Sequence, residues 1–440
     1  MKRVIKTSIF TLGLFMFLFL LNTNSNIKAE ESWGYAQTHM DDFLDQLDRD
    51  TNEDIVVALI DTGIDPNHSW FKAKDGSSRI VGGSFCDETG CTDETYDDGV
   101  LNYLDTSSNG HGTHIAGIIA KITPDNVKFL PIKVHTTIQG DFSGDAVIKA
   151  LIHVNELTKE YNIKVVNFGF ARNSVNECDL FESITYNHLA IDPLYRKGIL
   201  VVAPAGNTGG TDKASCLNGL TGVITVSSID KHYQIANNSS YGSSVDFAAP
   251  GVDIYSAKNN SDENATHSLS GTSQATGHIS ANIALLYADC PTCDAETIEL
   301  ALQKSAQVIG EKDKYGHGFI DMSIAHDALE EAIKEINALK VAKETQIKVN
   351  ICFSGPGTIT LPKHLFYKES TTKMGFSRKK CYQFYADKND TVTFNPNFLS
   401  SIKTVKVDGY NIARPLFAKQ TYVLTKQVNI EVKFGFLYIF

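Results

Sequence analysis

The sequence predicts an α/β domain with a mainly parallel sheet flanked by helices, followed by a small all-β domain. Four mostly aliphatic and β-branched runs lie at 55–60, 127–134, 163–168 and 198–205. Such runs are typical of strands buried on both faces of a parallel sheet. Helical stretches such as 144–160 separate them, and this alternation is typical of α/β domains. After residue 347 the pattern changes to short alternating runs, which predict the strands of an all-β domain.

The length and composition indicate two domains with sizeable cores. The chain has 440 residues, of which 42% are hydrophobic and 21% charged. We expect a first domain at 30–342, closed by an amphipathic helix at 323–342, and a second at 347–440. The alternating aromatic residues at the end resemble the last strand of an outer-membrane barrel. The segment is short for a barrel, so an ordinary final strand is favoured.

Residues 1–29 have the pattern of a secretory signal peptide. Basic residues precede an apolar stretch from Ile9 to Leu21, and a polar segment leads to Ala29. We expect cleavage there and a secreted or otherwise extracytoplasmic protein, in the periplasm or at a cell surface. The alternative is an uncleaved anchor. The apolar stretch is short for a membrane span, so we expect no stable membrane insertion after cleavage.

The charge balance excludes nucleic acid as an expected partner. Loss of residues 1–29 removes four basic residues and no acidic one, so the formal net charge falls from −11 to −15. An acidic protein repels the phosphate backbone. Six of the acidic residues lie in the segment 86–99. This segment is interpreted as a solvated surface loop, with a cation site or a rim that prefers basic substrate residues as alternatives.

The eight cysteines are an even set, and in an exported protein disulfides are expected. Neighbours in sequence suggest the pairs 86–91, 178–216, 290–293 and 352–381, although sequence alone does not fix connectivity. Cys290 and Cys293 also have the spacing of a redox CxxC motif. They lie between two expected helices and not after a strand, which favours a structural staple.

Three dispersed segments carry residue types used in nucleophilic catalysis. Asp61 ends the first strand run, His111 lies in a glycine-rich segment before a small apolar helix, and Ser273 precedes a helix that is apolar nearly all round. Alone, each has a structural explanation: a turn former, a packed histidine, a helix cap. Together their order is one in which an acid–base–nucleophile triad recurs. The imidazole would take the serine proton, and the carboxylate would orient the imidazole.

A fourth segment would supply the oxyanion donor. Asn207 lies among glycines at the end of the run 198–205, where its amide can donate a hydrogen bond. The backbone N–H of Ser273 at its helix start is a second donor. His111 and His114 are spaced for metal binding on one helix face, but no third ligand or HExxH pattern accompanies them. We expect no metal and no cofactor.

In their order and spacing, these segments resemble the four signature blocks of the subtilisin-like serine proteases, peptidase family S8. The resemblance covers about 33–335 and implies a subtilisin-like domain with the triad Asp61, His111 and Ser273 and the oxyanion donor Asn207. It further implies that a polypeptide substrate contacts two strand ends and one more residue: Phe168, Gly169, Phe170, Ala203, Ala205, Gly206 and Ser215. By the same alignment, a 178–216 disulfide would pin the rim of the specificity pocket.

Departures from the family pattern concern rate and specificity more than the triad. Gly277 stands where the family usually has proline, which suggests looser geometry beside Ser273. Gln274, Gly169 and Ala171 also replace more usual residues. The sequence leaves little room for a pro-domain or for the calcium-binding loop of many relatives. We therefore expect folding without a removed pro-segment and activity that persists in a chelator.

The resemblance implies a secreted serine endopeptidase that cleaves peptide bonds through an acyl-enzyme on Ser273. Two alternatives stay open. One is a catalytically weak protein that binds polypeptides, and the other is a protease dedicated to processing one partner. The cleavage preference and the role of the second domain carry no sequence signal.

Overall fold

The computed structural model describes residues 33–47, 53–93, 100–134, 144–170, 187–211, 217–260 and 262–345, and eight strands between 347 and 436. The chain divides into two compact units, 1–333 and 334–440. The predicted signal peptide, the acidic residues 94–99, Ala171, Cys178, Ser215 and Cys216 lie outside the described residues. The domain limits and signal cleavage therefore stay predictions.

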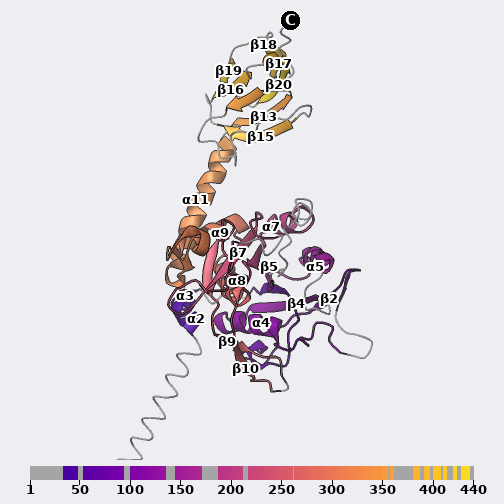
Figure 1. Ribbon diagram of the computed structural model, residues 1–440, viewed down its shortest axis with the longest axis vertical. Helices are drawn as coiled ribbons and strands as arrows, with labels where there is room; N and C mark the ends of the chain where they lie inside the picture. The colour runs from indigo at the N-terminus through magenta and orange to yellow at the C-terminus, as the bar shows by residue number, and fades with distance from the viewer. Residues whose placement is uncertain are drawn as a thin grey trace, which may run out of the picture. The chain divides into compact units, whose positions relative to one another are not determined.

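The first unit is built on one large sheet, of which β7, β5, β4 and β2 are labelled in Figure 1. Its strand order is β11-β12-β8-β7-β6-β5-β1-β4-β2-β3. Every pairing from β12 to β2 is parallel, and only the two edge pairings are antiparallel. This confirms the predicted α/β class. The strands are β1 Ile55–Asp61, β2 Ser84–Cys86, β3 Cys91–Asp93, β4 Val127–Val134, β5 Ile163–Phe168, β6 Leu200–Pro204, β7 Val223–Ile229, β8 Phe247–Pro250, β11 Ala306–Gln307 and β12 Phe319–Ile320.

Two apolar cores lie on the two faces of this sheet. Along β1, alternate side chains enter different cores, Val57 on one face and Val56 on the other. Helices α4 (His111–Ile122) and α8 (Thr272–Asp289) pack in the first core, and α5 (Gly144–Leu157) packs in the second. Every residue of α8 from Thr272 to Ala288 is buried, which explains why its sequence is apolar nearly all round.

Shorter elements complete the first unit. A hairpin of β9 (Ile254–Ala257) and β10 (Thr266–Leu269) pairs outside the large sheet. None of the helices among the described residues combines the length and the apolar character needed to cross a membrane. The other helices are α2 Trp33–Gln37, α3 Met40–Gln46, α7 Asp192–Tyr195, α9 Ala295–Lys304, α10 Lys312–Tyr315 and α11 Ala325–Thr345, with one-turn elements at Ser69–Phe71, Asn187–Ile191 and Met322–Ile324.

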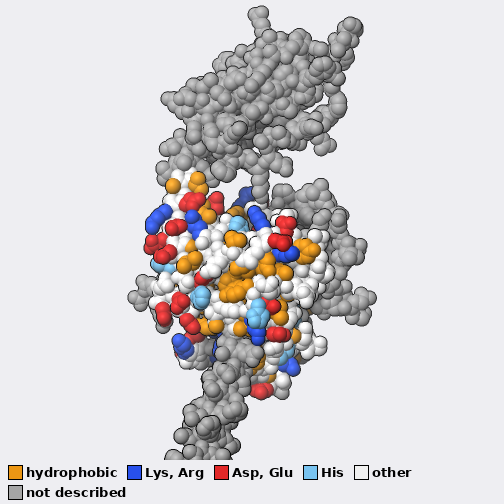
Figure 2. All heavy atoms as spheres, turned by 60° about the vertical axis from the view of Figure 1, so that its left-hand side comes forward, with side chains coloured by type: hydrophobic (Ala, Val, Ile, Leu, Met, Phe, Trp, Pro, Cys, Tyr) orange, Lys and Arg blue, Asp and Glu red, His pale blue; other side chains and the backbone are white. Residues whose placement is uncertain are grey.

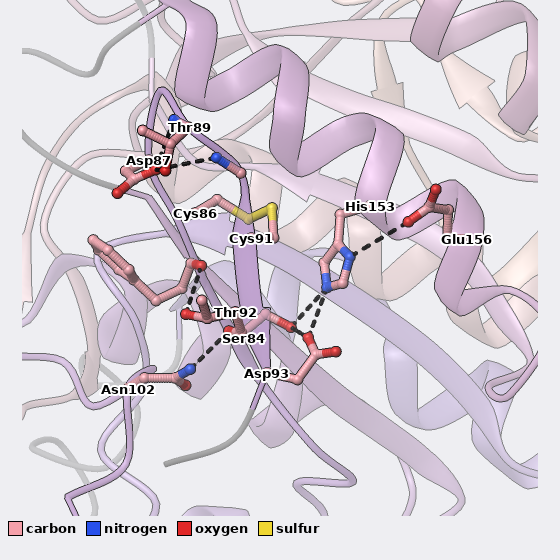
Figure 3. Close-up of a disulfide and its surroundings, with 12 residues drawn as sticks. Ser84, Cys86, Asp87, Thr89, Cys91, Thr92, Asp93, Asn102, His153 and Glu156 are labelled. Carbon is pink, nitrogen blue, oxygen red and sulfur yellow. Dashed lines mark hydrogen bonds and ion pairs between the residues drawn. A yellow bond between two sulfur atoms is a disulfide. The ribbon is translucent and has the colours of Figure 1, made fainter. Parts of the chain in front are cut away.

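Two of the four suggested disulfides are present. Cys86 is bonded to Cys91 across the β2–β3 hairpin, next to the contact of His153 with Ser84 and Asp93 (Figure 3). A second disulfide joins Cys290 and Cys293 between α8 and α9, where a structural staple was expected. The suggested 178–216 pair lies outside the described part of the chain.

The second unit contains two sheets, β15-β13-β20-β17-β18 and β14-β16-β19, as the alternating runs predicted. Cys352 and Cys381 are opposite each other in the antiparallel register of β13 and β15, and their disulfide remains a prediction. The strands are β13 Ile347–Ser354, β14 Gly357–Thr360, β15 Lys380–Ala386, β16 Thr391–Pro396, β17 Ser400–Val407, β18 Tyr410–Ala413, β19 Gln420–Val423 and β20 Val428–Phe436.

Candidate functional site

The end of β1 and the start of α4 bring Asp61 and His111 into direct contact. His111 Nδ1 lies 2.9 Å from Asp61 Oδ1 and 3.1 Å from Oδ2. The carboxylate is 1% exposed and also accepts a hydrogen bond of 2.7 Å from the backbone N–H of Thr62. A buried carboxylate held in this way fixes the orientation and tautomer of the imidazole, with Nε2 left to accept a proton.

Gly169 leaves the space that the Asp61 carboxylate occupies. A Cβ at position 169 would lie 1.7 Å from Asp61 Oδ2 and 3.0 Å from Ile115 Cδ1. In this packing even alanine would displace the carboxylate. The departure from the usual family residue at Gly169 therefore affects the orientation of the Asp61 carboxylate as well as the strand that is expected to contact substrate.

The carboxylate of Asp105 also affects the pKa of His111. Burial lowers the pKa of the His111 imidazole. The charge of Asp61, its hydrogen bond and the charge of Asp105 outweigh burial, so the pKa is raised above its ordinary value. Asp105 is 4% exposed. Asp105 was not among the residues predicted for the site, although a polar turn Asp105–Asn109 directly before a helix is a recognisable capping signal.

Asp105 and Thr62 complete the N-terminus of α4. The helix begins after Gly110, which has a left-handed backbone with φ of 60° and cannot cap with a side chain. Thr62 Oγ1 accepts from Gly112 N at 2.9 Å, and Asp105 Oδ2 accepts from Thr113 N at 3.1 Å. These contacts satisfy two N–H groups that have no partner inside the helix and fix the turn that carries His111.

Asn207 caps the N-terminus of α8 with a neutral amide. The helix begins after Gly271, which provides no side-chain cap. Asn207 Oδ1 accepts from Thr272 N at 2.9 Å and from Thr272 Oγ1 at 3.2 Å. Because a backbone N–H can only donate, this contact assigns the oxygen side of the amide and leaves Nδ2 as a donor beside the helix start. Ser273 follows Thr272 in the first turn, so Ser273 is not the helix cap.

A buried polar network connects the backbone of Ser273 to β5. Thr276 Oγ1 donates to the Ser273 carbonyl at 2.7 Å, and Asn167 Nδ2 on β5 donates to Thr276 Oγ1 at 3.0 Å. This network was not predicted, because Asn167 lies in the mostly apolar β5 run and was assigned only to a strand. Ser273 itself is 5% exposed.

Helix α4, which begins at His111, packs against α8, which carries Ser273. A Cβ at Gly277, four residues after Ser273, would lie 3.1 Å from Ile118 Cγ2 on α4. Ile118 thus packs against the position of the usual proline, and the looser geometry suggested by Gly277 stays a prediction. Among the described residues, no direct hydrogen bond joins His111 to Ser273.

The expected substrate-contacting residues lie at the ends of β5 and β6. Phe168 and Phe170 are 4% and 8% exposed, and their rings contact each other at a tilt of 46° with centroids 4.2 Å apart. Ala203, Ala205 and Gly206 are buried at the end of β6, and Gly206 N donates to Thr272 Oγ1 at 3.1 Å. Ser215 lies outside the described residues.

His114 has a structural role. Its Nε2 lies 3.0 Å from the Ile254 carbonyl, and its side chain is 0% exposed. Burial, followed by the charges of His267 and His111, lowers its pKa to about 3. In the described part of the chain, no group of three or more His, Cys, Asp or Glu side chains is arranged to hold a metal ion.

Comparisons with known proteins place this chain among proteases. The profile of the subtilase family, peptidase S8, matches residues 52–318. Subtilisin DY of Bacillus licheniformis is 29% identical over 282 residues, which are 62% of this chain and 90% of that protein. The minor extracellular protease Epr of Bacillus subtilis is 28% identical over 315 residues, which are 68% of this chain and 43% of that protein.

The solved structures agree on the fold. The crystal structure of a lanthipeptide protease aligns with a TM-score of 0.54 at 22% identity and covers 69% of this chain and 94% of that chain. The family profile spans more than half of the sequence, including Asp61, His111, Asn207 and Ser273. The chain therefore belongs to the subtilase family of serine proteases.

Proposed function

We propose that this protein is a secreted endopeptidase that hydrolyses internal peptide bonds of polypeptides through an acyl-enzyme on Ser273. The observation that supports this most strongly is the contact of His111 Nδ1 with both oxygens of Asp61, at 2.9 and 3.1 Å. That contact leaves the outer imidazole nitrogen as the only one able to act on a nucleophile. The start of α8, which carries Ser273, is the candidate partner.

In the acylation step, His111 Nε2 takes the proton of the Ser273 hydroxyl as its oxygen attacks the substrate carbonyl. The imidazolium that forms is stabilised by the Asp61 charge, and more distantly by Asp105, which together raise the His111 pKa. His111 then gives the proton to the leaving amine. Water repeats the sequence on the acyl-enzyme and releases the second product.

The oxyanion of the tetrahedral intermediate would receive hydrogen bonds from Asn207 Nδ2 and from the backbone N–H of Ser273. Asn207 is held in place because its oxygen caps α8 through Thr272 N at 2.9 Å. One such donor typically contributes about 3–4 kcal/mol of transition-state stabilisation. The same proposal includes two substrate-binding regions. The substrate backbone would pair with the strand end formed by Phe168, Gly169 and Phe170. A substrate side chain would enter a pocket lined by Ala203, Ala205, Gly206 and Ser215.

Export is supported by three independent features. The segment 1–29 has the pattern of a signal peptide, two disulfides are present, and a relative is named for its extracellular location. We propose that the protein acts outside the cytoplasm. Mass spectrometry of the mature amino terminus tests the cleavage after Ala29.

Labelling with a fluorophosphonate tests the catalytic assignment. Wild type should be labelled covalently, Ser273→Ala should not, and its peptide hydrolysis should fall by about 10⁴-fold or more. Ser268→Ala, a change at an exposed serine on the neighbouring strand, should keep full labelling. Equal labelling of the wild type and Ser273→Ala would remove Ser273 from the mechanism. A folded wild type that binds peptides without labelling would instead favour the polypeptide-binding alternative.

A further inference from the structure

A hollow of about 490 Å³ lies between α2, the last turn of α4 and the β9–β10 hairpin. Its volume is within the range of small-ligand sites. The chain contains two tryptophans, and both of them, Trp33 and Trp70, line this hollow. Figure 2 turns the side of the domain that carries α2 and α3 toward the viewer, and apolar side chains reach the surface near the middle of this face.

The hollow is separate from the catalytic residues. His111 is the first residue of α4 and Lys121, which lines the hollow, is ten residues further along. At 1.5 Å per residue, this places them about 15 Å apart along the helix axis. None of the residues assigned to catalysis or to substrate binding above lines the hollow.

Its aromatic walls are held in place by other contacts. Trp33 Nε1 donates to the Val252 carbonyl at 3.2 Å, and the Trp70 ring packs edge-on against His68 with centroids 5.5 Å apart. Tyr35 and Tyr255 add two further rings, each with its hydroxyl hydrogen-bonded. Rigid rings of this kind bind a flat apolar group with little loss of conformational entropy.

Lys121 gives the hollow its charge. It is the one charged side chain among the lining residues, and its Nζ lies 5.2 Å from the centre of the Trp70 ring. Among the described residues, no carboxylate lies within ion-pair distance of it. Cations are common at helix C-termini. Because this ammonium group lies over an indole in the wall of the hollow, an anion bound in the hollow can reach it. It also disfavours a cationic ligand.

Asn264 adds a neutral donor at the rim. Its Oδ1 accepts from Ser69 Oγ at 2.7 Å, so its NH₂ group is oriented away from that contact and can donate. The hollow thus combines aromatic walls, one ammonium group and one amide donor. A carboxylate attached to an apolar side chain complements all three.

We propose that this hollow binds the carboxyl-terminal residue of a peptide, with an aromatic or aliphatic side chain against Trp33 and Trp70 and the terminal carboxylate on Lys121. The site is an exosite for a peptide end and needs no contribution from Ser273 or His111. Its occupancy can therefore be measured without catalysis.

Tryptophan emission of the full chain reports on binding directly, because both indoles line the hollow. Titration with N-acetyl-phenylalanine should give a saturable change, and N-acetyl-phenylalanine amide should bind about fivefold more weakly, as expected for loss of one partly exposed ion pair. Lys121→Met should abolish the preference for the carboxylate. Lys159→Met, which changes an exposed lysine beyond α5 on the other face of the sheet, should keep it.

Equal affinity for the acid and the amide in the wild type would overturn the proposal. So would an unchanged preference in Lys121→Met, or saturable binding of cellobiose in place of the peptide-like acid, which would assign the aromatic walls to a saccharide. Trp70→Leu should weaken both phenylalanine probes alike, and a circular dichroism spectrum like that of the wild type would show that the loss is local. Full affinity in that variant would also overturn the proposal.

Discussion

Helices α4 and α8 solve the same structural problem with groups of different charge. Each begins after a glycine that has no side chain to cap it, Gly110 and Gly271. In α4 one partner is a carboxylate, since Asp105 accepts from Thr113 N, beside the Thr62 hydroxyl that accepts from Gly112 N. In α8 the partner is a neutral amide, since Asn207 accepts from Thr272 N. Asp105 lies in the turn directly before α4, whereas Asn207 lies 65 residues before Thr272, and both hydrogen bonds are near 3 Å.

The difference in charge matches the chemistry proposed at each helix. A negative cap near His111 helps to stabilise an imidazolium, and the raised pKa of His111 has Asp105 among its causes. A negative cap on α8 would instead neutralise the positive helix terminus at which the oxyanion is proposed to form. The amide caps the helix and leaves a hydrogen-bond donor free. A cap can thus be selected for its charge as well as for its hydrogen bond.

Replacing the neutral cap of α8, Asn207, by a charged residue should have the largest effect on activity. In Asn207→Asp, the carboxylate can still accept from Thr272 N, so the helix start should persist. The donor is lost and a negative charge faces the developing oxyanion, so kcat should fall by at least about 10²–10³. Steady-state kinetics measure this, and thermal unfolding checks that Tm changes little. A kcat within tenfold of wild type would exclude Asn207 as the oxyanion donor.

Each helix also buries a neutral histidine, which should make stability depend on pH. Burial is the first cause that lowers the pKa of His114, to about 3, and that of His278, to about 4. Their unfolded values lie near 6.5, so the unfolded state binds protons first. Stability should be complete above that value and fall as pH drops, by up to about 2.7 kcal/mol per pH unit between about pH 6 and pH 4.

Urea unfolding at a series of pH values measures this slope. His278→Gln should reduce it by about half, whereas His232→Gln, at an exposed turn, should leave it unchanged. His111 opposes the trend, because its raised pKa adds stability below its unfolded value that is lost as pH rises through the folded one. A stability independent of pH between 6.5 and 4 would contradict burial of neutral imidazoles on both helices.

Neutralising the charged cap should shift the pH profile more than the maximal rate. Asp105→Asn removes a charge that raises the His111 pKa. The free base then persists to lower pH, so the acidic limb of kcat/KM should move to lower pH. The cap contact weakens, which should cost about 1 kcal/mol of stability. Glu160→Gln, at an exposed carboxylate beyond α5, should leave the profile in place. An unshifted limb in Asp105→Asn would assign Asp105 to structure alone.

The sequence predicted the parallel sheet well because burial on both faces leaves a local signal. The runs 55–60 and 163–168 recur as β1 and β5 nearly residue for residue, and the Cys290–Cys293 staple follows from spacing. The expected helix at 144–160 was too long, since α5 ends at Leu157. The residues after it form a turn, in which the backbone N–H groups of Glu160 and Tyr161 donate to the Leu157 carbonyl.

The contacts that support the site could not be predicted where they join distant segments. Asn207 was expected as an oxyanion donor, but its capping contact with Thr272 spans 65 residues, and nothing local in the sequence pairs the two. Asp105 lies in the turn directly before α4 and was missed although that turn carries a capping signal. The packing of Ile118 against Gly277 could not be predicted for the same reason, because Ile118 lies on another helix.

A substitution at the contact between α4 and α8 should have the smallest effect on stability, and it tests the packing of the two helices directly. Gly277→Ala should gain about 1 kcal/mol of stability from helix propensity. The added Cβ would lie 3.1 Å from Ile118 Cγ2. Crowding in a packed core typically costs about 1–3 kcal/mol, or slightly less when the neighbouring side chain can move. We expect a net change near zero in the wild type. In the Ile118→Val background the same substitution should stabilise the protein, because the side chain that it crowds is smaller. The coupling free energy from this double-mutant cycle should be about 1 kcal/mol by urea unfolding. Additive effects would mean that α4 and α8 do not meet at these residues, and the arrangement that brings His111 toward Ser273 would then lose its direct support.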